Sequence, residues 1–341
     1  MVLSYEEIKS LTTGVSTVIE SFDGIRFHRF TAEQEAYYEI TSPNAERNFY
    51  DRCLATAGVR MMFKTDSKTL KLKGSVIKRT SRNYYSFDIF VNGKEIGNID
   101  NFSNVELSDD YTEQEFPLSD FSREFSLIEG IKEVCIYFPW SVEVVLNELS
   151  IDDGAFVQPV KREKKLLAFG DSITQGYDAL RPSNRYVSRL SDMLYVEETN
   201  KGIGGEFFVP ELARCSDDFE PDYITVAYGT NDWSKKSEDD FILRCKSFFE
   251  NLKSNYPHSK IFAITPVWRA DYQGKRKFGN FENVEKGIRN VTSDFENVFL
   301  IPGFNLINHE RIFFADSRLH PNDEGFIRYS DNLYSQLVKH L

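Results

Sequence analysis

The pattern of apolar and polar residues changes near residue 160 of this 341-residue chain. Before that point, residues 70–73 alternate apolar with polar, and the apolar run 87–91 leads directly into Asn92-Gly93. Alternation with period two is typical of half-buried strands, and Asn-Gly between strands is a strong hairpin signal. Further strands are predicted at residues 58–65, 132–140 and 142–151, with very little helix. The pattern predicts an all-β sandwich, with a jelly roll as one form of it, as a domain of residues 1–160, but it does not determine the strand order.

From residue 161 to 341 the pattern predicts a second domain of the α/β class. Apolar runs recur at residues 166–169, 194–197, 223–227, 261–264 and 298–301, and helical periodicity lies between them, for example at 186–194 and 239–252. Strands about thirty residues apart, with helices between them, are βα units that build a parallel sheet. The domain boundary is expected within 154–164, where Gln158-Pro159-Val160 interrupts regular structure.

Charge and cysteine usage narrow the classes of partner. The net charge is −12 and no dense basic run exists, which argues against nucleic acid or an anionic membrane surface. The amino terminus is polar and lacks the apolar core of a signal peptide, so we expect a cytoplasmic protein without a membrane span. The four cysteines, at positions 53, 135, 215 and 245, have no metal-site spacing and are expected to be buried free thiols. We expect neither a metal nor another cofactor; the oligomeric state is not determined.

The residues that could take part in catalysis lie at the predicted carboxyl ends of the strands. Ser172 follows the run 166–169 after Gly170, at a strand-to-helix turn. On its own, this serine is equally explained as a helix cap. Three further segments, 200–205, 229–232 and 316–321, follow later strands. In a doubly wound sheet these ends meet at one edge, so the four segments are expected to form one crevice.

The residue types in that crevice suit acyl transfer. Ser172 is a nucleophile that needs a base, His320 titrates near neutral pH, and Asp316 would hold the imidazole in one tautomer. The Ser172 N–H, a glycine N–H from 200–205 and the Asn231 amide could stabilise an oxyanion. Taken singly, these residues also fit turns, caps or surface positions. Their joint order favours catalysis.

These segments resemble the GDSL, or SGNH, hydrolase superfamily. Residues 170–173 (GDSI), 200–205 (NKGIGG), 229–232 (GTND) and 316–321 (DSRLHP) are similar to its four blocks. The resemblance implies a flavodoxin-like catalytic domain and assigns the oxyanion N–H of the second block to Gly205. An all-β domain ahead of such a hydrolase is similar to the second family of carbohydrate esterases.

One spacing departs from the family pattern. The family usually has aspartate three residues before the histidine, a position held here by Ser317, whereas Asp316 lies four before His320. We expect a local one-residue bulge to restore the contact. The alternative is a Ser–His dyad whose imidazole is held by a backbone carbonyl.

The resulting hypothesis is a metal-independent serine esterase that forms an acyl-enzyme. Polar and aromatic residues around the blocks favour a short acyl group, acetyl first, on a carbohydrate. Trp233, Trp268 and Arg269 are candidate walls of the substrate pocket, with packing in the core as the alternative. Three other functions remain open: a lipase or thioesterase, an acyltransferase, and a catalytically silent glycan-binding protein.

Overall fold

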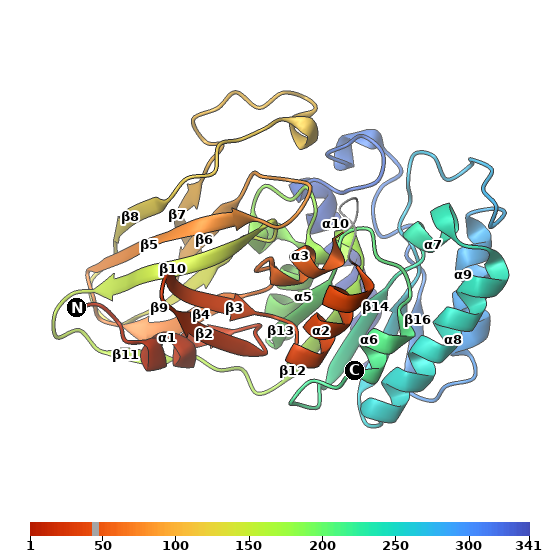
Figure 1. Ribbon diagram of the computed structural model, residues 1–341, viewed down its shortest axis with the longest axis horizontal. Helices are drawn as coiled ribbons and strands as arrows, with labels where there is room; N and C mark the ends of the chain where they lie inside the picture. Colours follow the sequence, from red (N-terminus) through yellow and green to blue (C-terminus); the bar gives the residue numbers. More distant parts are fainter. Residues whose placement is uncertain (43–47) are drawn as a thin grey trace.

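The computed structural model describes residues 1–42 and 48–341, and these form two antiparallel sheets followed by one parallel sheet (Figure 1). The first antiparallel sheet has the order β1 (Thr12–Thr13), β4 (Arg60–Thr65), β9 (Lys132–Tyr137), β6 (Ser86–Val91), β7 (Lys94–Asp100), and β11 (Val157–Pro159) also pairs with β4. The second has the order β2 (Thr17–Ser21), β3 (Gly24–His28), β10 (Val142–Ile151), β5 (Thr69–Lys78), β8 (Phe121–Ser126).

The two antiparallel sheets share one apolar core, which confirms the predicted all-β sandwich. Met61, Phe63 and Ile136 of the first sheet and Leu70 and Leu72 of the second are all buried in it. The β6–β7 hairpin turns at Asn92 and Gly93, whose φ angles of 49° and 75° are those that the Asn-Gly signal predicts. We call the part of the chain that forms these two sheets the β domain.

The expectation of very little helix before residue 160 is wrong. Three helices, α1 (Tyr5–Leu11), α2 (Ala32–Thr41) and α3 (Phe49–Leu54), interrupt the strands, and a 3₁₀ turn, η2 (Tyr111–Glu113), follows β7. The helices α1 and α2 each begin with a capping box, Ser4 with Glu7 and Thr31 with Gln34. This spacing of Ser or Thr before Glu or Gln is the sequence signal that marked both helix starts.

The parallel sheet has the order β13 (Glu197–Gly202), β12 (Lys165–Gly170), β14 (Tyr223–Ala227), β15 (Lys260–Ile264), β16 (Val298–Ile301), so the flavodoxin-like α/β class is confirmed. Side chains of alternate strand residues face opposite layers. Leu166 and Ala168 share a core with α5 (Tyr186–Leu194) and α10 (Asp323–Leu337). Leu167 and Phe169 share another with α6 (Pro210–Arg214), α8 (Glu238–Asn255) and α9 (Glu282–Thr292).

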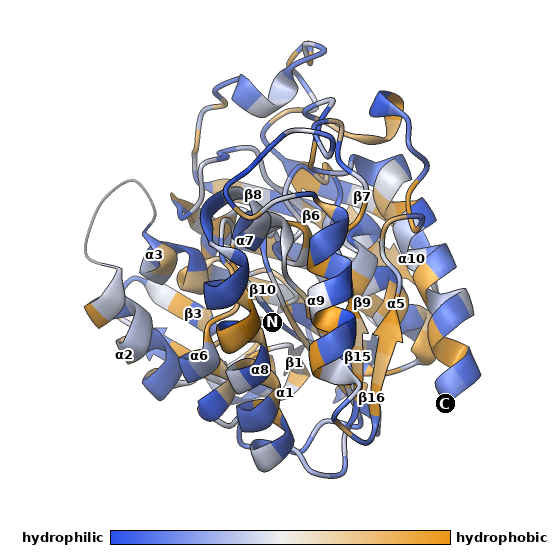
Figure 2. Ribbon diagram, turned by 90° about the vertical axis from the view of Figure 1, so that its right-hand side faces the viewer, coloured by the Kyte–Doolittle hydropathy of each residue, from blue (hydrophilic) through white to orange (hydrophobic). Residues whose placement is uncertain are grey.

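The helices of this domain are amphipathic, and their buried faces are mainly apolar. Figure 2 shows both hydrophilic and hydrophobic colour on α8, α9 and α10, whereas β15 and β16 are mainly hydrophobic. This is the amphipathic pattern of helices that lie between a core and solvent. Across residues 1–42 and 48–341, no helix combines the length and the apolarity that a membrane crossing requires. Short helical segments complete the domain: α4 (Ser172–Gln175), η3 (Pro182–Asn184), α7 (Thr230–Lys235), η4 (Arg311–Phe313) and η5 (Val338–His340).

One predicted strand is misplaced. The second strand of the α/β domain was expected at 194–197, but Leu194 ends α5 and the strand β13 runs over Glu197–Gly202. Its sequence is polar, yet Glu198, Asn200 and Lys201 are buried. An apolar run therefore could not identify it.

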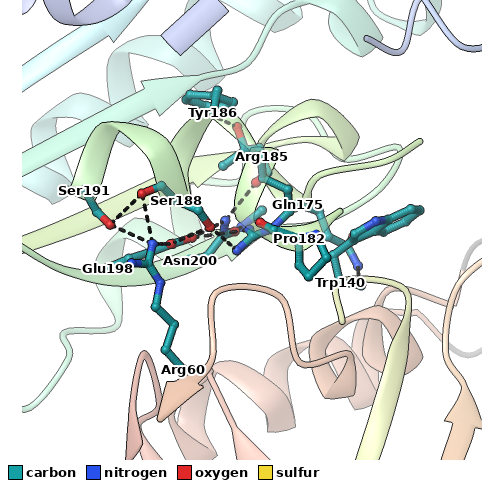
Figure 3. A network of polar contacts seen from close by, with 12 residues as sticks. Arg60, Trp140, Gln175, Pro182, Arg185, Tyr186, Ser188, Ser191, Glu198 and Asn200 are labelled. Atoms are coloured by element: carbon teal, nitrogen blue, oxygen red, sulfur yellow. Dashed lines mark hydrogen bonds and ion pairs between the residues drawn. The ribbon is translucent and has the colours of Figure 1, made fainter. Parts of the chain in front are cut away.

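The burial of β13 depends on arginines that lie around it (Figure 3). Arg60 of β4 contacts the Glu198 carboxylate at 2.8 Å and Asp192 at 2.7 Å, and Arg185 contacts Glu198 at 3.3 Å. Burial by itself would raise the pKa of Glu198, but these two guanidinium groups outweigh it and lower the pKa. The β domain is thereby joined to the parallel sheet through buried charges that satisfy one another.

Candidate active site

Ser172 lies directly after β12, at the carboxyl edge of the parallel sheet. The Asp171 carboxylate caps α4 by accepting the Ile173 N–H at 3.0 Å, so Ser172 occupies the first position of the helix. Gly170 permits this turn, because a Cβ there would lie 2.0 Å from Thr174 Oγ1. The Ser172 Oγ lies 2.9 Å from His320 Nε2. This is hydrogen-bond distance for a nucleophile and its base.

Asp316 reaches the other nitrogen of the same imidazole. Its Oδ2 lies 3.0 Å from His320 Nδ1, and its Oδ1 accepts the backbone N–H groups of Arg318, Leu319 and His320 at 2.9, 2.7 and 3.1 Å. Ser317 has a φ of 53°, in the left-handed region, and forms the local bulge that the four-residue spacing requires. Ser172, His320 and Asp316 are thus arranged in one chain of contacts, in the order expected from the sequence.

The charges around His320 favour its protonated form. Burial by itself would lower the pKa of His320, but hydrogen bonds and attraction from Asp178 and Asp316 raise the pKa to about 9. Burial works against ionisation of Asp316 too, yet the hydrogen bond and charge of His320 and the backbone donors hold its pKa well below the usual range. The site therefore stabilises an imidazolium, which is the species that forms when histidine takes a proton from serine.

Ser172, Gly205 and Asn231 each have an N–H group that could donate to an oxyanion. The N–H groups of Ser172 and Gly205 have no acceptor among the described residues. The Asn231 Nδ2 donates one hydrogen to the Glu206 carbonyl at 2.8 Å, which leaves its second hydrogen available. These are the three groups that the sequence assigned to an oxyanion hole.

Both backbone polar groups of Gly204 have partners. The Gly204 N–H donates to Gln175 Oε1 at 2.8 Å, and Arg52 of α3 donates to the Gly204 carbonyl oxygen. In a trans peptide the carbonyl oxygen and the following N–H point in opposite directions. Because Arg52 fixes the Gly204 carbonyl oxygen, the Gly205 N–H points the opposite way. Arg52, a residue of the β domain, thereby orients the candidate oxyanion donor.

The candidate pocket residues Trp233, Trp268 and Arg269 are not walls of an open pocket. They are 0%, 7% and 3% exposed. The Trp233 indole donates to the Gly279 carbonyl at 3.0 Å, and Arg269 pairs with Asp271 and lies over the Trp233 ring. Trp268 stacks on His309, and Arg269 also donates to Thr230, so all three side chains fit the alternative of packing in the core.

Sequence reasoning missed a second carboxylate at His320. The Asp178 Oδ2 lies 3.3 Å from His320 Nδ1, and Arg82 of the β domain contacts Asp178 Oδ1 at 2.8 Å. Asp178 follows the first motif block by a few residues, but no family block includes it. Asp178 and Arg82 are far apart in the sequence, so no local pattern links them.

Within the described residues, Asp178, Asp316 and His320 form the one group whose side chains are close enough together to hold a metal ion. Ligand atoms of Asp178, Asp316 and His320 all lie within 4.8 Å of one another. Each already has a hydrogen-bonding partner, and Arg82 adds a positive charge to the cluster. This donor set therefore fits a hydrogen-bonded proton relay better than a cation site.

Comparison with known proteins identifies the C-terminal part of the chain. The GDSL-like lipase/acylhydrolase family model matches residues 168–326, whereas no curated protein matches the sequence. A salicylyl-acyltransferase from a tetracycline biosynthetic pathway has a TM-score of 0.78 at 17% identity, covering 96% of this chain and 94% of that one. A candidate GDSL-like lipase from Bacteroides ovatus has a TM-score of 0.75 at 20% identity, covering 100% and 97%.

A family two carbohydrate esterase from Cellvibrio japonicus also has the same two-domain layout, with a TM-score of 0.66 at 14% identity and coverage of 100% and 97%. At these identities the similarity to solved structures shows the fold alone. The family match carries more, because it includes the segments that hold Ser172, Asn231 and His320. Residues 168–326 are therefore a GDSL-like lipase/acylhydrolase domain, and the protein is an ester hydrolase.

Proposed function

We propose that the protein is a serine esterase that cleaves short-chain acyl esters of a carbohydrate through an acyl-enzyme. The observation that carries this proposal is the chain of contacts from Ser172 Oγ to His320 Nε2 at 2.9 Å and from His320 Nδ1 to Asp316 Oδ2 at 3.0 Å. The available N–H groups of Ser172 and Gly205 lie on the same edge of the sheet. Nucleophile, base and oxyanion donors are the parts that ester cleavage requires.

The reaction proceeds in two balanced steps. His320 Nε2 takes the Ser172 hydroxyl proton while Oγ attacks the ester carbonyl carbon, and the oxyanion accepts hydrogen bonds from Ser172, Gly205 and Asn231. His320 then gives the proton to the leaving alcohol, and the acyl group stays on Oγ. Water attacks that acyl-enzyme in the same way and releases the carboxylic acid. Each oxyanion donor contributes about 3–4 kcal/mol of transition-state stabilisation.

The short acyl group is supported by polar and aromatic residues beside the nucleophile, such as Gln175 and Tyr177, whose ring lies 5.6 Å from the His320 imidazole. The carbohydrate half of the proposal is supported by the fold shared with the family two carbohydrate esterase, and fold analogy is a weaker argument than site geometry.

Acyl transfer is a second candidate, favoured by the similarity to the salicylyl-acyltransferase along nearly the whole chain. In that reaction an alcohol other than water would attack the acyl-enzyme, with the same residues in the same roles. Formation of a new ester when a sugar alcohol is added at high concentration, at the expense of free acid, would identify it.

The test is a series of p-nitrophenyl esters from acetate to palmitate, followed by acetylated xylose and glucose. We expect kcat/KM to be greatest for acetate or propionate and acetate to be released from the sugars. Ser172→Ala is the matched control. It should lose several orders of magnitude in rate and change in stability by less than about 1–2 kcal/mol. A kcat/KM that rises beyond about eight carbons would contradict the short-chain claim, and full activity in Ser172→Ala would contradict the mechanism.

A further inference from the structure

The imidazole of His320 has two carboxylates at one nitrogen. Asp316 Oδ2 and Asp178 Oδ2 lie 3.0 and 3.3 Å from Nδ1. The Asp178 side chain is fully buried, and the residue has a φ of 72°, in the left-handed region that non-glycine residues seldom adopt. A buried charge in a strained backbone conformation persists only where its surroundings fix it.

The β domain supplies those surroundings. Arg82 Nε donates to Asp178 Oδ1 at 2.8 Å, Arg82 Nη2 to Oδ2 at 3.3 Å, and the Tyr84 hydroxyl to Oδ1 at 2.5 Å. The Tyr111 hydroxyl donates to the Asp178 carbonyl at 2.7 Å. Arg82 and Tyr84 lie between β5 and β6, and Tyr111 lies in η2, so every one of these donors comes from the β domain. The carboxylate has one remaining direction of contact, which is toward His320.

We propose that Asp178, held by Arg82 and Tyr84, is a positioning residue for His320, through which the β domain sets the orientation, tautomer and basicity of the catalytic base. This inference rests on the proposed esterase function. It gives the β domain a part in the chemistry, beyond any binding of a substrate.

Among the described residues, four charged groups lie around His320. They come from its own loop, from the turn after α4, from the end of β12 and, behind Asp178, from the β domain: Asp316, Asp178, Asp171, Arg82. The Tyr177 ring lies 5.6 Å from the imidazole and brings no charge in its neutral form. Asp178 and Arg82 have opposite charges, so removing one or the other changes the field at Nδ1 in opposite directions.

This opposition gives a test that a purely structural role cannot mimic. We measure kcat/KM for p-nitrophenyl acetate against pH in wild type, Asp178→Asn and Arg82→Gln. Asp178→Asn removes an anion beside the imidazolium and should lower the pH midpoint by about one unit or more. Arg82→Gln leaves the Asp178 charge uncompensated and should raise it. We expect a rate loss of about 10–100-fold in Asp178→Asn, with the loss in kcat more than in KM.

Asp100→Asn is the matched control. Asp100 pairs with Arg181 at 2.8 Å, which is another, partly buried ion pair between the two halves of the chain, and Asp100 is not among the groups that contact His320. It should leave the midpoint unchanged. Slower Asp178→Asn and Arg82→Gln enzymes that keep the wild-type midpoint would overturn the proposal, because Asp178 would then only support packing.

Direct titration of the His320 ring by NMR, assigned by its loss in His320→Gln, separates this inference from the esterase proposal. Opposite shifts in the two variants would support the positioning role even if no ester were cleaved, and an unshifted ring would overturn it even in an active enzyme. If Asp178→Asn does not fold, the sign of the Arg82→Gln shift alone decides.

Discussion

A single residue, Ser317, controls how the Asp316 carboxylate meets His320. Its φ of 53° places a non-glycine residue in the left-handed region, which costs about 1–2 kcal/mol. The three backbone N–H groups that Asp316 Oδ1 accepts offset this cost. They also fix the carboxylate so that its second oxygen can only point toward Nδ1. The geometry of the triad thus comes from backbone hydrogen bonds within one loop.

At this residue scale, Asp316→Asn should lower kcat by roughly 10²–10³-fold for a simple activated ester. Asparagine keeps the shape, but it cannot stabilise an imidazolium and it favours the wrong tautomer. We expect the loss to be smaller than for an isolated triad carboxylate, because Asp178 still contacts Nδ1 at 3.3 Å. Steady-state kinetics at several pH values measures it.

Ser317→Ala is the control for that change, and it should keep near-normal kcat because the Ser317 hydroxyl contacts no catalytic group in the described structure. Ser317→Gly should be neutral or slightly stabilising, since glycine accepts a φ of 53° without strain. Near-normal activity in Asp316→Asn would show instead that Asp178 or a backbone carbonyl is sufficient to orient the histidine.

The raised pKa of His320 predicts opposite effects of pH on activity and on stability. A general base must be neutral, so kcat/KM should rise with pH through a midpoint near 9. For stability, the pKa of His320 is higher in the folded state than the ordinary value of 6.5. The stabilising contribution is therefore complete below pH 6.5 and is lost as the pH rises through about 9, and it amounts to about 3 kcal/mol.

Thermal denaturation at pH 6 and at pH 10 checks the stability half of this prediction, with His320→Gln as the reference. The difference in free energy of unfolding between wild type and His320→Gln should shrink toward high pH. A difference that is constant with pH, together with a kcat/KM midpoint near 6.5, would contradict the raised pKa.

At the scale of elements, the sequence predicts those strands and helices whose burial is apolar. The strand β14 and the helix α5 have the boundaries that periodicity predicts, because most of their buried residues are hydrophobic. The strand β13 was misplaced because Glu198, Asn200 and Lys201 are buried through partners that lie elsewhere in the chain, such as Arg60 and Asp217. A hydrophobicity pattern has no information about such distant pairs.

The same distinction explains which residues of the candidate site could be predicted from the sequence. Ser172, Asn231 and His320 lie in local motifs, so a sequence can bring them together through a predicted sheet order. Asp178, Arg82 and Arg52 have no motif, and their roles depend on how the β domain packs against the parallel sheet. Trp233 was misassigned for the converse reason: a residue near a motif was expected in the pocket, but its partner, Gly279, holds it in the core.

At the scale of the whole molecule, the interface between the β domain and the parallel sheet is built from buried charges. Arg60 lies between Glu198 and Asp192, and Arg29 donates to the carbonyl oxygens of Asn200 and Gly202 at 2.7 and 2.8 Å. Buried charges of this kind tolerate little change in relative position, since every displacement leaves a charge without its partner. The two halves of the chain should therefore unfold together.

We predict that Arg60→Gln lowers the free energy of unfolding by about 3–5 kcal/mol, because the buried Glu198 carboxylate and the partly exposed Asp192 carboxylate lose the cation they share. In a chain of this size the corresponding fall in Tm is about 4–7 °C. Differential scanning calorimetry should show one transition in wild type and one, at lower temperature, in Arg60→Gln. Activity measured well below both Tm values should change much less than stability, because Arg60 does not contact Ser172 or His320.

Lys68→Gln is the matched control. Lys68 pairs with Glu129 at 3.0 Å with 67% and 85% of the two side chains exposed, so solvent screens the pair and its loss should change Tm by no more than about 1–2 °C. Two separate transitions in Arg60→Gln, with the second at the wild-type temperature, would mean that the parallel sheet is stable without the β domain. Arg82 would then fix Asp178 less firmly, because a β domain that separates before the parallel sheet unfolds cannot hold the orientation of His320. A single shifted transition is what the buried charges across this interface require.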